Sequence, residues 1–171
     1  NYKWGNAMND KLNKVIERQQ KQIEEPHKKE DDVVQLVGFI IGQEEYAVPI
    51  LSIQEIIKPI EYTRVPSVPS YILGVFNLRG SVIPLLDLRT KFKMEPAKVT
   101  EDTRYIVMKG KDNTAGFVID RLTEAIRIKS SKIGPPPETI HADKGMVYGI
   151  GMREDNILTI LKVESLLKRD F

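Results

Sequence analysis

Short apolar segments alternate with polar turns from Val33 onward, a spacing typical of a protein built from many short β-strands. The first 32 residues differ, because they are rich in Lys, Glu, Gln and Asp. Their few apolar residues recur near helical spacing: Met8, Leu12, Val15, Ile16 and Ile23. This tail (1–32) is therefore expected to be either a solvated, partly disordered segment or a short amphipathic helix that ends before Pro26.

The region after the tail predicts two sets of five strands. The first set is expected at 35–41, 46–48, 53–58, 74–78 and 82–86, followed by a short helix that Asp87 caps. The second set is expected at 104–109, 115–120, 124–128, 148–152 and 157–161, followed by a closing helix.

The two sets are an internal repeat. The segment GVFNLRGSVIPLL (74–86) aligns without gaps on GIGMREDNILTIL (149–161). Upstream, YAVPILSIQEII (46–57) aligns on AGFVIDRLTEAI (115–126), which places Glu55 opposite Glu124. Five strands per unit suit small closed barrels, since closure removes exposed sheet edges.

The predicted fold is therefore mostly β, with two five-stranded β-barrels packed side by side, short helices and a C-terminal helix. The first barrel is expected over about residues 33–95, the second over about 101–161 and the closing helix over about 162–169. Edge strands could be exchanged between the barrels. The polar stretch 95–101 is the expected join.

The third predicted strand is apolar on both faces. Strict alternation places Ile53, Glu55 and Ile57 on one side and Ile56 on the other. One face can fill a barrel, whereas the other needs cover from the neighbouring half or serves a partner.

Prolines mark irregular positions in the predicted strands. Two of them rule out a central strand over 65–69, which should be a rigid connection. Pro49 and Pro84 lie inside apolar segments and indicate an edge or a bulge there. Arg79, at the tip of a predicted hairpin, is either a solvated turn charge or a planar donor for a partner.

Composition excludes several functions. The chain has 171 residues, a net charge of +2 and no cysteine, so charge gives no argument for nucleic acid and thiolate chemistry is absent. No apolar segment approaches the roughly 20 residues of a membrane span, and no signal pattern is present at the start. We expect a cytoplasmic protein that does not insert into the membrane.

Candidate catalytic groups are few. His27 and His141 have no patterned partners and no metal-ligand spacing. Asp87 is better explained as a helix cap and Glu124 as a strand-surface charge than as a carboxylate pair with Asp120. The sequence contains no nucleophile elbow or phosphate loop. We therefore expect no catalytic residues, no metal and no cofactor, and the chain is predicted not to be an enzyme.

The longest motif gives a specific resemblance. The segment VPSVPSYILGVFNLRGSVIPLLDLR (65–89) resembles the signature of CheW-like domains. Further similarity covers EEYAVPILSIQEI (44–56), VIDRLTEAI (118–126) and the PPPE element (135–138), so it extends from residue 33 to about 168. The resemblance implies two Src-homology-3-like barrels, in agreement with the repeat.

The CheW family implies a function and partners. Its members couple the cytoplasmic tip of chemoreceptors (methyl-accepting chemotaxis proteins) to the regulatory domain of the histidine kinase CheA, in arrays at the inner face of the membrane. Carried onto matching positions, the family's receptor contacts are Ile53, Glu55, Gly74, Asn77 and Arg79. Kinase-facing residues do not transfer and stay unknown. The alternative is a double β-barrel that binds a small ligand or nucleic acid.

Overall fold

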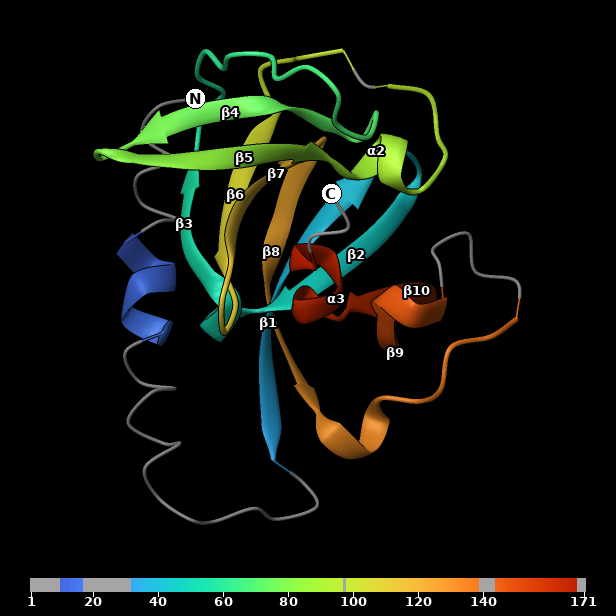
Figure 1. The fold of residues 1–171 in the computed structure, drawn as a ribbon. Coiled ribbons are helices and arrows are strands. Elements are labelled where there is room, and N and C mark those ends of the chain that lie inside the picture. The colour runs from blue at the N-terminus through green and yellow to red at the C-terminus, as the bar shows by residue number, and fades with distance from the viewer. Residues whose placement is uncertain (1–9, 17–31, 97, 139–143, 169–171) are drawn as a thin grey trace.

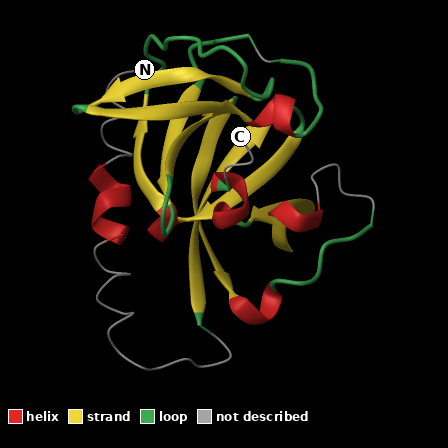
Figure 2. Ribbon diagram, viewed as in Figure 1, coloured by secondary structure: helices red, strands yellow, loops and turns green. Residues whose placement is uncertain are grey.

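The computed structural model describes residues 10–16, 32–96, 98–138 and 144–168. Strands dominate it and form two five-stranded sheets (Figures 1 and 2). The predicted mostly β fold with two five-stranded units is therefore confirmed. The short helices are also present where the sequence predicts them, α2 (Leu88–Lys91) after Asp87 and α3 (Val163–Leu167) near the end.

The first sheet has the strand order β8-β1-β2-β10-β9. Three of its neighbouring pairs are antiparallel, namely β8–β1, β1–β2 and β10–β9, and β2 and β10 run parallel over three residues. The strands are β1 (Val33–Ile41), β2 (Glu44–Pro49), β8 (Arg121–Lys129), β9 (Val147–Arg153) and β10 (Asn156–Leu161).

The second sheet repeats this arrangement in the order β3-β6-β7-β5-β4. Its parallel pair joins β5 to β7. The strands are β3 (Ile53–Ile57), β4 (Ile72–Leu78), β5 (Ser81–Asp87), β6 (Arg104–Lys109) and β7 (Thr114–Ile119). The single-turn helices are η1 (Ile50–Ser52), η2 (Ser130–Lys132) and η3 (Lys144–Met146).

Each sheet combines strands from both sequence repeats. Strands β1 and β2 of the first repeat join β8, β9 and β10 of the second, whereas β6 and β7 join β3, β4 and β5. Two copies of one pattern have thus exchanged their first two strands. Neither repeat can complete a sheet alone, so the two halves of the chain depend on each other for burial.

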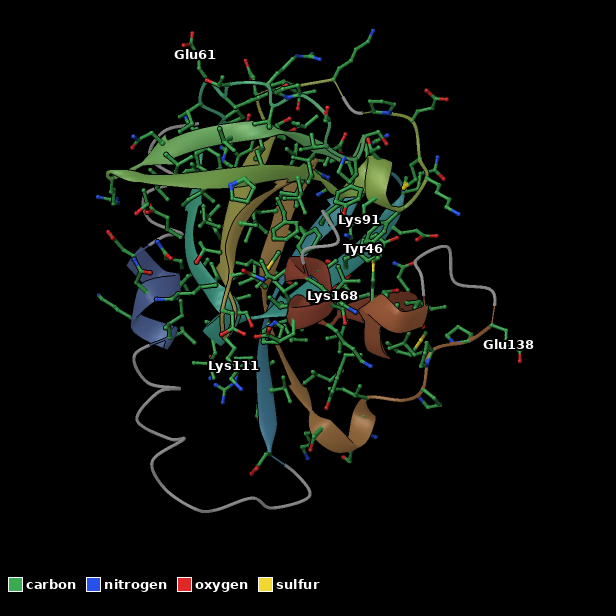
Figure 3. All side chains as sticks on the ribbon, viewed as in Figure 1. Tyr46, Glu61, Lys91, Lys111, Glu138 and Lys168 are labelled. Carbon is green, nitrogen blue, oxygen red and sulfur yellow. The ribbon has the colours of Figure 1, made fainter. Side chains whose placement is uncertain are left out.

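One large apolar cluster spans both sheets. It includes Phe39 and Tyr46 from the first sheet and Ile106 and Phe117 from the second, all at most 1% exposed. Tyr46 also packs on Phe92 behind α2, with ring centroids 5.3 Å apart, and Figure 3 shows Tyr46 beside that helix. This shared cluster holds the two sheets in fixed positions.

Of the two possibilities for the tail, the helix is the one formed over residues 10–16. Leu12 is only 2% exposed and belongs to the large cluster, and Val15 and Ile16 pack against it. In Figure 1 this blue helix lies beside β3. Apart from Asp32, the rest of the predicted tail, including Pro26, lies outside the described residues.

The sequence predicted an edge or a bulge at Pro84. Strand β5 is not an edge, because it lies between β7 and β4, but its register with β4 shifts between Ile72 and Gly74, next to Val75, the partner of Pro84. However, β7 pairs only with Leu85–Asp87, so Pro84 stands where β5 has no neighbour on that side. Pro49 likewise ends β2, beyond its pairing with β10. The missing N–H groups therefore fall where few ladder bonds are lost.

Candidate functional site

The β4–β5 hairpin carries an ion pair that reaches back to β3. Arg79 Nε donates to Glu55 Oε1 at 3.0 Å and Nη2 donates to Oε2 at 3.2 Å, a two-pronged contact. The Arg79 side chain is 77% exposed, whereas that of Glu55 is 15% exposed. The hydrogen bonds to Glu55, and then its negative charge, raise the pKa of Arg79. The hairpin therefore presents a permanently charged, oriented guanidinium to solvent.

The turn itself holds Arg79 in place. Arg79 and Gly80 both have positive φ, at 52° and 88°, a conformation that glycine adopts most easily. Asn77 Oδ1 accepts a hydrogen bond from the Gly80 amide at 3.0 Å. Asn77 is exposed and its side chain thus both closes the turn and faces solvent.

Gly74 has a different environment. It is buried, and a Cβ at this position would lie 2.2 Å from the carbonyl oxygen of Thr63. Thr63 and Val75 exchange two backbone hydrogen bonds of 2.8 Å, which fixes this close approach. The glycine therefore allows the 58–71 connection to pack against β4.

The predicted face assignment of β3 is wrong. Ile53 and Ile56 belong to the same core cluster, at 4% and 3% exposed, while Ile57 packs in a second cluster. The register with β6 shifts between Ile53 and Glu55. Such a bulge inserts one extra residue and breaks the alternation on which the prediction depended.

The five residues predicted to contact a receptor thus separate into two groups. Glu55, Asn77 and Arg79 gather at the hairpin tip, where polar atoms reach solvent. Ile53 and Gly74 are buried, Ile53 in the core cluster and Gly74 against Thr63. Their role in binding stays a prediction.

A second arginine cluster occupies the corresponding place in the first sheet. Arg153, at the end of β9, donates to Glu45 of β2 and Glu124 of β8. The repeat already placed Glu124 opposite Glu55, and it placed Glu154, the neighbour of Arg153, opposite Arg79. Sequence reasoning treated Glu124 as a surface charge and missed Arg153, although the repeat alignment carried the signal.

This second cluster borders a crevice of about 770 Å³. Carboxylates outnumber basic groups along it: Glu44, Glu45, Glu124, Glu154 and Asp155 against Arg121 and Arg153. Such a lining repels phosphate, so it does not favour the nucleic-acid alternative.

A third ion pair joins the end of the signature motif to the second half. Arg89 Nη2 and Nε donate to the two carboxylate oxygens of Asp120 at 2.7 and 3.1 Å. Asp120 also accepts from the Gly42 amide at 2.8 Å. Asp87, as predicted, caps α2 by accepting from the Arg89 amide at 3.0 Å. These contacts are structural, because they tie a helix to two turns.

Other candidates for chemistry contribute no site. His27 and His141 lie outside the described residues. Across 10–16, 32–96, 98–138 and 144–168, no group of His, Cys, Asp or Glu could hold a metal ion. In the same part of the chain, no helix is long and apolar enough for a membrane span.

The two five-stranded sheets exchange strands, and a hairpin arginine is held by a glutamate of a neighbouring strand. These features define a class of β-rich domain, and comparison with known proteins identifies the family. The CheW-like domain model matches residues 35–171. The chain is 55% identical over 166 residues to the chemotaxis protein CheW of Helicobacter pylori, covering 96% of this chain and all of that protein.

More distant relatives agree. The chemotaxis protein CheW of Bacillus subtilis is 31% identical over 136 residues, which cover 79% of this chain and 87% of that protein. The crystal structure of the scaffolding protein TtCheW from Thermoanaerobacter tengcongensis superposes with a TM-score of 0.74 at 29% identity, covering 85% of this chain and 93% of that one. The chain belongs to the CheW-like family. These relatives are named for chemotaxis and scaffolding, and the protein is an adaptor and not an enzyme.

Proposed function

We propose that this protein is a chemotaxis scaffold that couples chemoreceptors to the histidine kinase CheA in arrays at the inner face of the membrane. The receptor tip would contact the surface formed by Glu55, Asn77 and Arg79, and Ile53 and Gly74, which are buried in the free protein, are the other predicted contacts. A separate surface would hold the kinase regulatory domain. Signals would then pass through the relative positions of partners and not through chemistry.

The observation that carries this proposal is the oriented Arg79. The Arg79 side chain is 77% exposed, and a free side chain of this length loses much rotamer freedom when a partner binds. The two hydrogen bonds to Glu55 already fix the plane of the Arg79 guanidinium. A preorganised guanidinium at a rigid hairpin tip suits a polar, register-setting contact with a helical hairpin.

The test is a charge series measured against a soluble chemoreceptor hairpin fragment. Arg79→Glu should weaken binding by more than about tenfold, because it reverses the exposed charge and repels Glu55. The thermal midpoint should stay close to that of wild type, since exposed ion pairs contribute little to stability. Calorimetric titration and a melting curve measure both.

The charge-swapped double variant Glu55→Arg with Arg79→Glu is the matched control. It rebuilds an ion pair between the same two positions but presents the opposite charge. If Arg79 contacts the receptor, the swap should not restore binding. Full recovery would show that the pair is only structural, and unchanged binding by Arg79→Glu alone would reject the proposed contact.

A further inference from the structure

The surface beside β3 is covered by the N-terminal helix of the chain itself. Leu12, Asn13, Ile53, Glu55 and Ile56 line one small hollow at this place. Leu12 is 2% exposed in contact with the cluster that contains both isoleucines. An amphipathic helix thus lies where β3, the edge strand of its sheet, would otherwise be open.

Over the described residues 10–16, the helix packs through a small apolar side. Leu12, Val15 and Ile16, spaced three and four residues apart, form this side, and the other residues of 10–16 are exposed. Leu12 is the buried residue among these seven, so loss of its contact should weaken the docking of the helix.

The area that the helix covers overlaps the proposed receptor surface. Glu55 both lines the hollow and holds Arg79. Ile53 is 4% exposed and lines the same small hollow as Leu12, so a partner that reaches Ile53 from this side would have to displace the helix. A receptor tip that contacts Ile53 from this side and the docked helix would therefore exclude each other.

We propose that helix 10–16 is an intramolecular competitor of the receptor tip: it covers β3 in the free protein and leaves when the tip binds. This inference depends on the proposed function, because it names the regulation of the same surface. If helix 10–16 is docked about 90% of the time, the apparent affinity of the protein for the receptor tip falls about tenfold, because only the open fraction can bind the tip.

Two sets of full-length variants test the cover. Leu12→Ala removes its anchor and should tighten binding of the chemoreceptor hairpin fragment by up to about tenfold. Lys14→Gly and Lys14→Ala change one exposed residue and lose the same charge, but glycine lowers helix propensity relative to alanine. The glycine variant should therefore bind up to about fivefold more tightly than the alanine variant.

Amide hydrogen exchange reports directly whether helix 10–16 is docked, which the receptor affinity alone does not. Amides of residues 10–16 should exchange faster in Leu12→Ala without any partner, and faster in wild type when the receptor fragment is added. Faster exchange together with tighter binding supports the competitor.

The remaining outcomes separate the two proposals. Weaker or equal binding by Leu12→Ala and Lys14→Gly, while wild type binds, would overturn the competitor and leave the proposed function standing. Slower exchange of 10–16 on receptor binding would also overturn it, because the helix would then be part of the platform. If no variant binds the receptor fragment, the proposed function fails and the competitor fails with it.

Discussion

Gly74 leaves no room for a side chain, and this limits how its part in binding can be tested. A methyl group would lie 2.2 Å from the Thr63 carbonyl oxygen, a backbone atom fixed by two hydrogen bonds. Loss of binding in a Gly74 variant could therefore arise from displaced backbone and need not reflect a lost contact.

We expect Gly74→Ala to lower the free energy of unfolding by at least about 2 kcal/mol, because the added methyl overpacks a buried site. Gly134→Ala is the matched control, since a Cβ there meets nothing within 4 Å. Urea unfolding measures both. Equal stability of the two variants would show that β4 and the 58–71 connection adjust freely.

Tyr46 supplies a pH dependence. Burial, followed by the hydrogen bond from its hydroxyl to Glu44 at 2.7 Å and the charge of Glu44, raises the pKa of Tyr46 well above its ordinary value of 10.0. The folded state thus holds this proton more tightly than the unfolded state. The stability that Tyr46 contributes is complete below pH 10 and is lost as the pH rises above it.

Tyr46→Phe should cost about 1 kcal/mol near pH 7, from the lost hydrogen bond. Above pH 10 the free energy of unfolding should fall less steeply for Tyr46→Phe than for wild type. The two slopes should differ by up to about 1.4 kcal/mol per pH unit. Unfolding titrations between pH 7 and 11 compare the two slopes. Parallel curves would mean that Tyr46 ionises as easily folded as unfolded.

At the scale of elements, Asp120 joins three pieces of the fold. It follows β7 and receives Arg89 from α2 and the amide of Gly42 from the β1–β2 turn. Both side chains of the ion pair are only about one fifth exposed, at 22% and 21%. Removing the carboxylate leaves a partly buried guanidinium without its partner.

Asp120→Ala should therefore destabilise the protein by about 2–4 kcal/mol. Asp112→Ala, in an exposed turn, should change stability by less than about 0.5 kcal/mol. Thermal melts of the two variants give the comparison. An Asp120 variant as stable as the Asp112 control would show that the three elements hold together without this tie.

Element positions were largely predictable because alternation and turn residues are local signals. All ten strands lie where the pattern predicts them, and β6 has the predicted bounds at Arg104–Lys109. Strand β8 extends past its predicted 124–128 at both ends, because it pairs along nearly all of β1.

Long-range and irregular features could not be predicted in the same way. The pairing of β1 with β8 joins residues far apart in sequence, and no local pattern specifies it. The bulge after Ile53 changed which side chains are buried. At the site, the motif located Arg79, but its geometry with Glu55 and the cover by Leu12 came only from the structure.

At the scale of the whole molecule, strand exchange gives a single body with related surfaces at two places. Arg79 with Glu55 marks one sheet, and Arg153 with Glu124 marks the other. Their hairpins differ in character: Met152 and Ile157 pair across the second hairpin and are 63% and 48% exposed, where the first has Asn77 and Val82. Two unlike surfaces on one rigid core suit a protein that holds two different partners.

The central claim is simultaneous binding, and sedimentation velocity measures it directly. Wild-type protein mixed at micromolar concentrations with a CheA regulatory domain and a chemoreceptor hairpin fragment should form a ternary complex. Arg79→Glu should keep the kinase complex and lose the receptor. Failure of the wild-type protein to bind either partner, or an unchanged ternary complex with Arg79→Glu, would contradict the account.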